Sequence, residues 1–498
     1  MFPRFFAGAL LLVAVEPLVA QPACANLAAL SLPRTTITSA VLAPATASAP
    51  AHCVVQAITR PTKDSEIRLQ VWLPVSGWNG KYLQLGNGGW AGQISAAAAN
   101  DPLARGYAVA ATDDGHLSSQ PGASWAVGHP EKLIDFGYRA VHETSVQAKA
   151  VVRAFFGRDA DRSYFNGCSD GGREALMEAQ RYPEDFDGII AGAPASNWSH
   201  LFTGFIWNEQ ALAETPIPAA KLPTIQNAVL AACDAMDGVK DGLLEDPRAC
   251  RFDPSALQCK AADAATCLTD GQVATLRKVY GGAKNPRTGK QIFPGWPAGT
   301  EAVPGGWPLW LLQGMHANFG NAYYGQAVFE QANWDFRTLN FDTDVELGDT
   351  KAGAVLNATN PDLRSFRANG GKLIQYHGWG DAAISPLSSI EYYESVRGFL
   401  GRFPDARHAS TDPSDFYRLF LVPGMGHCGG GLGPNVFNVL TALDTWVERG
   451  AAPEKIIGSG KAADDPAKPL TRPLCPYPQT AHYRSGDPND ASNFVCAQ

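Results

Sequence analysis

A serine between glycines is the first feature of the chain that predicts chemistry. The run at 167–171 reads Gly-Cys-Ser-Asp-Gly, a pattern in which the serine occupies a tight turn between a strand and a helix. The flanks agree, because Tyr164 and Phe165 suit the end of a strand and the segment 173–181 suits a helix. Ser169 is therefore the candidate nucleophile, and the alternative is an ordinary serine in a glycine-rich turn.

A base and an acid for this serine are predicted later in the chain. A serine hydroxyl becomes a good nucleophile when a histidine accepts its proton and a carboxylate orients that histidine. His427 follows a strong strand pattern at 419–422 and lies in a glycine-rich loop, which makes it the candidate base. Asp381 follows the strand pattern at 372–376 and is the candidate acid.

Two other residues compete for these roles. His377 is a second candidate base, but it precedes the acid and lies beside the acid's own strand, which favours a structural role. Asp187 is a second candidate acid, but it lies in a Phe-Asp-Gly sequence typical of an exposed turn.

The elements that must position these residues alternate between strand and helix. Strand patterns occur at 66–75, 81–85 and 107–112, and helical spacing covers 133–156. We expect the helix to face inward with Ala140, Val141, Val146, Ala150 and Val151. The alternation stops at about Asn197 and resumes after about Arg367. This predicts an α/β domain formed by 21–196 and 368–498, with helices on both faces of its sheet, and an inserted cysteine-rich domain at 197–367.

Composition excludes some partners and suggests a location. The 498 residues carry 40 Lys and Arg against 48 Asp and Glu, with no basic block, so nucleic acid is not an expected partner. Residues 1–20 read as a signal peptide, with Arg4, an apolar stretch and Leu18-Val19-Ala20 before the cut, although a buried N-terminal helix is the alternative. No later segment predicts a membrane span. We expect a secreted or periplasmic protein, and the sequence makes no prediction of its oligomeric state.

All ten cysteines follow this cut, and an even number in an exported chain favours disulfides. Proximity suggests Cys233–Cys250, Cys259–Cys267 and Cys475–Cys496. Cys168 and Cys428 adjoin Ser169 and His427, so they would come within bonding distance if those two side chains are hydrogen-bonded. Cys24 and Cys53 are the remaining two, and the sequence leaves the connectivity open.

These motifs resemble the tannase/feruloyl esterase family of serine hydrolases, in which a cysteine beside the catalytic serine is bridged to a cysteine beside the catalytic histidine. The matching runs are Gly-Cys168-Ser169-Asp-Gly-Gly, His377-Gly-Trp-Gly-Asp381 and Pro-Gly-Met-Gly-His427-Cys428. The resemblance covers essentially all of the mature chain. It implies an α/β-hydrolase fold with a large lid at 197–367, a triad of Ser169, His427 and Asp381, and the bridge Cys168–Cys428.

The resemblance also implies a substrate class and an oxyanion hole. Members hydrolyse feruloyl esters of plant cell walls, galloyl esters of tannins or a terephthalate monoester. The oxyanion donors would be the backbone N–H groups of Asp170 and of a glycine in Gly86-Asn87-Gly88-Gly89. Gly89 is the preferred glycine by its place after the strand, and Gly88 is the second choice.

A calcium site in the lid is implied as well. The matching loop would supply the carboxylates of Asp234, Asp237 and Asp241 and the carbonyls of Val239 and Leu243, and oxygen ligands of this kind suit a hard cation. Without the resemblance the loop reads as a solvated acidic turn. The expected role is structural, away from the chemistry.

Aromatic residues in the lid decide the expected substrate. The segment 288–336 contains one lysine, Lys290, and no arginine. It is rich in aromatic residues, of which seven are candidates for the acyl pocket: Trp307, Trp310, Phe319, Tyr323, Tyr324, Phe329 and Trp334. If they form the acyl pocket, an uncharged phenolic ring fits better than a second carboxylate. The alternative for any one of them is lid core.

The prediction is therefore a feruloyl esterase-like enzyme acting on a small aromatic ester, with a tannase or a mono(2-hydroxyethyl) terephthalate hydrolase as alternatives. A secreted peptidase with the same triad is the rival among enzymes. A non-catalytic binding module on a hydrolase scaffold is the alternative from another class.

Overall fold

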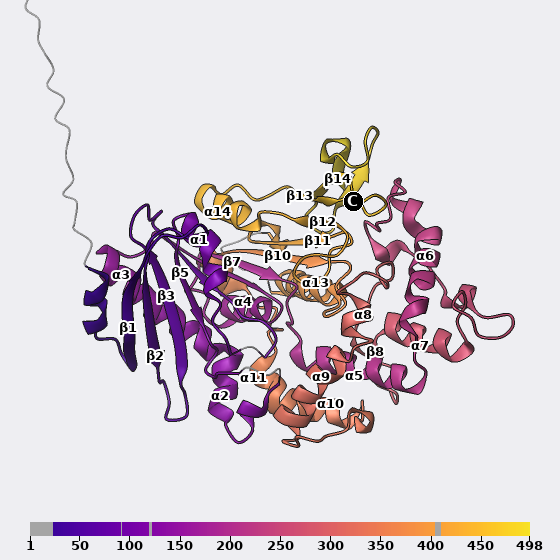
Figure 1. Cartoon of the computed structure of the whole chain (residues 1–498), viewed down its shortest axis with the longest axis horizontal. Coiled ribbons are helices and arrows are strands. Elements are labelled where there is room, and N and C mark those ends of the chain that lie inside the picture. Colours follow the sequence, from indigo (N-terminus) through magenta and orange to yellow (C-terminus); the bar gives the residue numbers. More distant parts are fainter. Residues whose placement is uncertain (1–22, 91, 119–121, 404–409) are drawn as a thin grey trace, which may run out of the picture.

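A nine-stranded sheet forms the centre of the computed structural model, which describes residues 23–90, 92–118, 122–403 and 410–498 (Figure 1). The predicted signal peptide, 1–20, lies outside the described residues. In spatial order the strands are β1 (Thr35–Ala43), β2 (His52–Thr59), β3 (Ile67–Pro74), β5 (Ala108–Thr112), β4 (Lys81–Leu85), β6 (Arg162–Cys168), β7 (Gly188–Gly192), β10 (Lys372–Gly378) and β11 (Tyr417–Val422).

The sheet is antiparallel at its N-terminal side and parallel from β5 to β11. The carboxyl ends of the parallel strands therefore meet at one edge, where sites form in open α/β sheets. The loops after β6, β10 and β11 carry Ser169, Asp381 and His427, so the topology brings the three together although they are far apart in the sequence.

Helices cover both faces of the sheet, as the sequence predicts. On one face α3 (Ala140–Phe156), α4 (Asp170–Arg181) and α13 (Pro386–Arg402) pack over a core that includes Leu69, Val71, Phe165 and Leu373. On the other, α1 (Asn100–Ala104) and α14 (Val439–Arg449) pack over Trp72, Leu83, Tyr164 and Ile374. Alternate residues of each strand thus serve the two cores.

The predicted helix at 133–156 is present in three parts: α2 (Pro130–Ile134), a π-helical turn at Asp135–Arg139, and α3. One of its predicted inward positions is wrong, because Val146 is 45% exposed. The buried face runs through Val141, Ala148 and Val152 at helical spacing, and a residue five positions after Val141 is turned away from that face.

The segment between β7 and β10 contributes no strand to the central sheet and forms a helical lid, seen on the right and below the sheet in Figure 1. Its elements are α5 (Trp198–Glu214), α6 (Leu222–Cys233), α7 (Asp270–Gly281), β8 (Ala283–Lys284), β9 (Gln291–Phe293), α8 (Trp307–Trp310), α9 (Met315–Asn321), α10 (Thr343–Gly348), α11 (Ala354–Leu356) and α12 (Arg364–Ala368). Lid residues such as Phe202 and Tyr323 share one hydrophobic cluster with Trp90 and Ala382, so the lid packs directly on the loops at the active edge.

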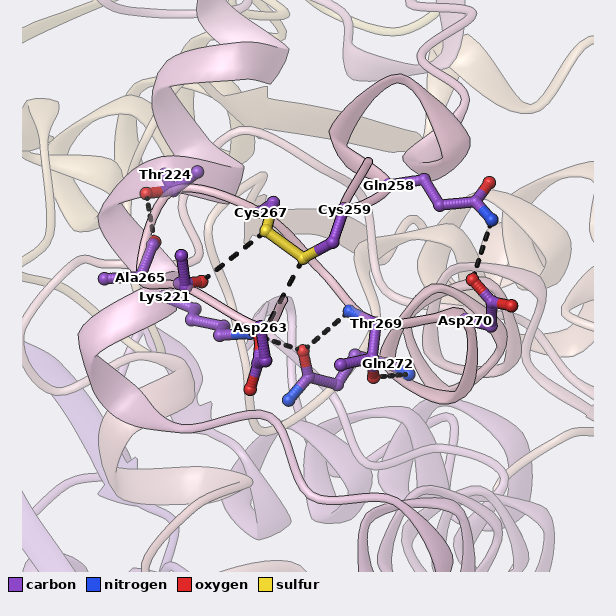
Figure 2. Close-up of a disulfide and its surroundings, with 11 residues drawn as sticks. Lys221, Thr224, Gln258, Cys259, Asp263, Ala265, Cys267, Thr269, Asp270 and Gln272 are labelled. Carbon is purple, nitrogen blue, oxygen red and sulfur yellow. Dashed lines mark hydrogen bonds and ion pairs between the residues drawn. A yellow bond between two sulfur atoms is a disulfide. The ribbon is translucent and has the colours of Figure 1, made fainter. Parts of the chain in front are cut away.

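Five disulfides link the pairs that the sequence suggested: Cys24–Cys53, Cys168–Cys428, Cys233–Cys250, Cys259–Cys267 and Cys475–Cys496. Figure 2 shows the Cys259–Cys267 bond in the lid, which closes the loop that carries Asp263. Asp263 pairs with the buried Lys221, whose ammonium also donates to Gln272 at 2.7 Å. The bond therefore holds the loop in place beside α6 and α7.

The chain ends in small antiparallel sheets, β12 (Gly433–Val436) with β13 (Ile456–Lys461) and β14 (Pro469–Leu474), and β15 (Thr480–Tyr483) with β16 (Phe494–Ala497). The second of these sheets packs on the loop after α6, since Ala481 and Phe494 share a hydrophobic cluster with Val239. Figure 1 shows β12, β13 and β14 near the C-terminus. Among the described helices, none has the length and apolar character needed to cross a bilayer.

Candidate active site

Ser169 occupies a sharp turn between β6 and α4. Its φ of 67° and ψ of −119° lie in a region that a non-glycine residue adopts at a cost, and three backbone hydrogen bonds hold it there. The Ser169 N–H donates to Gly192 at 2.9 Å, and its carbonyl accepts from Ala195 at 3.0 Å and Arg173 at 3.1 Å. The turn presents the hydroxyl at the edge of the sheet.

The flanking glycines are required by close backbone contacts. A Cβ at position 167 would lie 2.3 Å from the Gly171 carbonyl oxygen, and one at position 172 would lie 2.3 Å from that of Gly192. Any side chain at these positions would push α4 away from β6 and β7. This explains the glycine pattern from which the nucleophile was predicted.

The structure brings the three predicted triad residues together. His427 Nε2 lies 2.9 Å from Ser169 Oγ, and His427 Nδ1 lies 2.8 Å from Asp381 Oδ2. A carboxylate only accepts, so Nδ1 donates to Asp381 and Nε2 is left to accept from the serine hydroxyl. This is the arrangement that a general base and its orienting acid need.

The Asp381 carboxylate is fully buried and saturated with donors. Its Oδ1 accepts from the backbone N–H groups of Ala383 at 2.8 Å and Ile384 at 2.9 Å. Burial alone would raise the pKa of Asp381, but the charge of His427 and hydrogen bonds from His377 and His427 outweigh it and hold the pKa below its ordinary range. Asp381 is thus kept as an anion.

Neither of the two competing residues occupies the position for which it was a candidate. His377 is buried on β10 and contacts Asp381, with Nε2 3.2 Å from Oδ2, whereas the hydrogen bond to Ser169 comes from His427. Asp187 accepts from the Ser163 N–H at 2.8 Å at the start of β6, the opposite end of that strand from Ser169. The contact between His377 and Asp381 was not foreseen from the sequence.

Backbone bonds and a disulfide tie the acid and histidine loops to the rest of the edge. The Gly380 N–H donates to Met425 at 2.9 Å and the Trp379 N–H to Val422 at 2.9 Å. Cys168, directly before Ser169, is bonded to Cys428, directly after His427. The loop that carries His427 is therefore held by backbone hydrogen bonds before the histidine and by the disulfide after it.

The loop after β4 lies against the start of α4. The Asn87 carbonyl accepts from the Gly171 N–H at 2.9 Å, and the Asn87 N–H donates to Glu174 Oε2 at 3.0 Å. The Asn87 side chain donates to Asp114 Oδ2 at 2.7 Å. Asn87 thereby fixes the loop that carries Gly88 and Gly89 next to the first residue of α4, Asp170, whose N–H has no partner within the helix.

A buried acidic cluster underlies this loop. Oxygen atoms of Asp114, Asp170 and Glu174 lie within 4.8 Å of one another, and Arg173 Nε donates to Asp170 at 2.6 Å. Burial raises the pKa of all three carboxyls, that of Asp170 to about 7. This network was not predicted, because Asp114 lies far in the chain from Asp170 and Glu174 on α4.

Two of the seven predicted lid aromatics reach the catalytic residues. The Trp310 ring packs edge-on against His427 with centroids 5.4 Å apart and stacks on Phe319 at 5.9 Å. The Phe319 ring lies 3.4 Å from the position that a Cβ on Gly89 would take. Both rings are partly exposed, so they can contact a bound acyl group.

The other five lie in the lid core. Trp307 packs on Tyr280, the Tyr323 hydroxyl donates to Gly348, and the remaining three rings form one cluster of Tyr324, Phe329 and Trp334. These five residues therefore pack within the lid, which was the alternative to a role in the acyl pocket.

The predicted calcium loop folds around its carboxylates. Asp234 accepts from the Gly242 N–H, and Asp237 accepts from the Val239 and Glu245 N–H groups. Burial raises the pKa of Asp234 and of Asp237, and the charge of Asp241 raises both further.

One cation of the chain already contacts the loop, since Arg472 on β14 donates to Asp241 Oδ2 at 2.6 Å and lies 3.5 Å from Glu245. The side chains of Asp234, Asp237 and Asp241 offer only oxygen atoms, the donor type that a hard divalent cation takes. Among the described residues their oxygens do not form a group within 4.8 Å of one another, so only the type of donor fits the cation.

This loop was expected to lie away from the candidate catalytic residues, but it packs against the loop that carries His427. A Cβ on Gly424 would lie 2.6 Å from Leu243 Cδ2, and one on Gly433 would lie 3.1 Å from Leu243 Cδ1. Leu243 thus packs against the loop that begins three residues before His427.

Comparisons with known proteins agree with this geometry. Residues 53–497 match the family model described as Tannase and feruloyl esterase. The chain is 44% identical to an uncharacterized esterase of Xanthomonas campestris pv. campestris, over 96% of this chain and 91% of that protein. It is 36% identical to mono(2-hydroxyethyl) terephthalate hydrolase of Piscinibacter sakaiensis, over 91% and 87%. The crystal structure of feruloyl esterase B from Aspergillus oryzae is similar with a TM-score of 0.86 at 29% identity, over 95% of this chain and 99% of that one.

The sheet, its covering helices and the serine turn define an α/β-hydrolase, and the matches make it a carboxylic ester hydrolase. The chain belongs to the tannase and feruloyl esterase family. The predicted fold class, enzyme class and family are thereby confirmed.

Proposed function

We propose that this protein is an exported serine esterase that hydrolyses esters of hydroxycinnamic or related phenolic acids. The observation that carries the proposal is the hydrogen-bonded row of Ser169, His427 and Asp381 at the sheet edge, with the Trp310 ring packed against His427. Five disulfides support an oxidising location outside the cytoplasm.

The proposed reaction is acyl transfer in two steps. Ser169 Oγ attacks the ester carbonyl carbon while His427 Nε2 accepts its proton, and Asp381 stabilises the imidazolium that forms. His427 then protonates the departing alcohol as the acyl–oxygen bond breaks. A water molecule, deprotonated by His427, attacks the acyl-enzyme and releases the acid and the free serine.

The negative oxygen of each tetrahedral intermediate would lie at the start of α4. The Asp170 N–H and the Gly89 N–H, with Gly88 as the alternative, are the proposed donors, each lowering the barrier by about 3 kcal/mol. Asn87 supports this assignment, since it bonds the glycine loop to α4 through Gly171 and Glu174.

The charges of the lid favour an uncharged acyl ring. Arg287 and Arg337, the arginines that bound the aromatic segment, pair with Asp342 and Asp335. A second carboxylate on the acyl group would thus lack a free arginine from these two positions. Because of this lack of a free arginine, we take feruloyl-type esters as the first choice and galloyl and terephthalate monoesters as the alternatives. The similar proteins include both a solved feruloyl esterase and a mono(2-hydroxyethyl) terephthalate hydrolase.

We also propose that the loop at 234–243 binds calcium through Asp234, Asp237, Asp241 and the carbonyls of Val239 and Leu243. The proximity of Asp241 to Asp234 and to Asp237, whose pKa it raises, supports this, and the ion would stabilise a loop that packs on the histidine loop.

The test is a comparison of initial rates on methyl ferulate, methyl gallate and mono(2-hydroxyethyl) terephthalate, for wild type and Ser169→Ala. We expect methyl ferulate to be hydrolysed fastest and the variant to lose about 10⁴-fold or more. A preference for either other ester would reassign the substrate. A folded wild type that hydrolyses none of them, tested beside a peptide amide, would favour the binding-module or peptidase alternative.

A further inference from the structure

We propose that His377 is a positioning residue of the catalytic centre: a second imidazole that binds the same Asp381 oxygen as His427 and fixes it for that histidine. The proposal rests on the assignment of Ser169, His427 and Asp381 as the catalytic residues. It assigns a role in the reaction to a residue that the sequence presented as a rival base for which a structural role was favoured.

The contacts of His377 fix the hydrogen on its ring. Nε2 lies 3.2 Å from Asp381 Oδ2 and 3.0 Å from the Ile384 carbonyl oxygen. Both partners only accept hydrogen bonds, so Nε2 must carry a hydrogen and donates to both. His377 therefore binds Asp381 as a donor.

The other ring nitrogen anchors the imidazole to α13. Nδ1 lies 2.7 Å from Ser389 Oγ, and both residues are fully buried. In the neutral ring with its hydrogen on Nε2, Nδ1 accepts from the Ser389 hydroxyl. The ring is thus held between β10 and α13, in one tautomer and one orientation.

Asp381 then receives four donors, two on each oxygen. Oδ1 accepts from Ala383 and Ile384, and Oδ2 accepts from His427 and His377. Four donors match the four acceptor positions of a carboxylate. Of these, His377 is the one besides His427 itself that holds Oδ2, the oxygen that orients the catalytic imidazole.

Ile384 closes the arrangement. Its N–H donates to Asp381 Oδ1 while its carbonyl accepts from His377 Nε2. The carboxylate, the imidazole and this peptide therefore form a ring of hydrogen bonds that resists rotation of the Asp381 carboxylate.

His377 also changes the charge that His427 experiences. Among the described residues, His427 and His377 contact Asp381 and help to hold its pKa low, and the buried His316, bonded to the neighbouring Ala382 carbonyl, also interacts with its charge. A donor on Oδ2 draws negative charge away from the contact with His427. Without that donor Oδ2 would present more negative charge to His427, so the pH dependence of activity should change.

The experiment compares three variants on p-nitrophenyl acetate and methyl ferulate across pH. His377→Phe keeps ring volume but removes both nitrogens, His377→Gln keeps an N–H near the position of Nε2, and Ser389→Ala removes only the hydroxyl on Nδ1. His142→Phe is the matched control, because His142 Nδ1 makes a similar bond to Asp185 at 2.7 Å on the N-terminal part of α3. Fold is checked by circular dichroism and thermal unfolding.

We expect His377→Phe to lower kcat about 10- to 100-fold at nearly constant KM and to change the pH profile of activity. His377→Gln should recover much of kcat, Ser389→Ala should fall between the two, and His142→Phe should match wild type. If folded His377→Phe keeps the wild-type kcat and pH profile, the proposal is wrong. The same holds if His377→Gln and His377→Phe lose activity equally while both are folded, since volume alone would then explain the loss.

The Ser169→Ala variant separates this result from failure of the proposed function. If Ser169→Ala remains active, the triad itself is wrong. If Ser169→Ala is inactive and the His377 variants are normal, only the role of His377 is wrong. Should His377→Phe fail to fold, the kcat and pH profile of His377→Gln and Ser389→Ala decide, and wild-type values in both would overturn the proposal.

Discussion

Cys168 and Cys428 form a disulfide that joins positions 260 residues apart, with their Cα atoms separated by 5.9 Å. Each is the immediate neighbour of a proposed catalytic residue, and both Ser169 and Cys428 have positive φ values. The bond therefore holds two strained turns at a fixed separation, and with them the serine and its base.

Replacing both cysteines should damage catalysis more than binding. In Cys168→Ala/Cys428→Ala we expect kcat to fall about 10-fold or more with a small change in KM, because the His427 loop loses its support. The free energy of unfolding should fall by about 2–4 kcal/mol. Steady-state kinetics at a temperature where the variant is folded checks the first expectation, and thermal unfolding the second.

The matched control is Cys259→Ala/Cys267→Ala, which removes the lid disulfide shown in Figure 2. That bond contacts the Lys221 and Asp263 pair rather than the triad, so kcat should stay near wild type. Equal losses in the two double variants would contradict a specific role for the bond between the catalytic turns.

Trp310 should set the preference for aromatic acyl groups. In Trp310→Leu we expect kcat/KM for methyl ferulate to fall about 10-fold more than for p-nitrophenyl acetate, because an acetyl group offers no ring to pack on. Trp334→Leu is the control, since this ring packs on Tyr324 and Phe329 in the lid core. A uniform loss on both esters in Trp310→Leu would assign the ring to support of His427 instead.

Motifs with local geometry were the part of the fold and site that the sequence predicted well. The turn around Ser169 needs glycines at fixed offsets, and β11 ends in the apolar run 419–422, so both signals can be read from the sequence alone. The serine, the acid and the histidine then meet because the strands before them are parallel, and the carboxyl ends of parallel strands lie at one edge of the sheet.

Contacts between distant elements had no such signal. The β1 and β2 hairpin was not predicted, and its strands pair by a register that the sequence pattern did not reveal. His377 was a second candidate base, with a structural role favoured. Its position in the sequence does not tell which carboxylate oxygen its buried ring will contact. Leu243 was expected away from the candidate catalytic residues, but its side chain packs against Gly424, a contact between segments far apart in the sequence.

Calcium removal should affect both stability and turnover. Chelation by EDTA should lower the apparent Tm by several degrees, because the repulsion among Asp234, Asp237 and Asp241 is no longer offset. The kcat should also fall, since Leu243 packs on the loop that leads to His427. Thermal unfolding and kinetics with and without added Ca²⁺ check both effects.

Asp237→Asn is the corresponding variant, because it removes one ligand charge and retains an oxygen near Val239. Its Tm should be lower than that of the calcium-loaded wild type and should respond less to EDTA. A wild-type Tm that is unchanged by EDTA and by added Ca²⁺ would rule out the site and leave Arg472 as the cation of this loop.

Glu209 should make stability decrease as pH rises. Burial raises the pKa of Glu209 from 4.5 to about 7, opposed by one hydrogen bond from the Ala317 N–H at 3.2 Å. Between these two pH values the folded protein keeps a proton that the unfolded chain has lost, so folding stability decreases with rising pH across this window. In Glu209→Gln, which retains the acceptor, this loss is absent.

We therefore expect the free energies of unfolding of Glu209→Gln and wild type to be similar near pH 4 and to differ by about 2–3 kcal/mol at pH 8, where the variant is the more stable. Thermal or denaturant unfolding at the two pH values measures the difference. Glu214→Gln, an exposed position on the same helix that pairs with Lys278, should show no such gain. A Glu209→Gln advantage that is the same at both pH values would mean that packing rather than ionisation causes it.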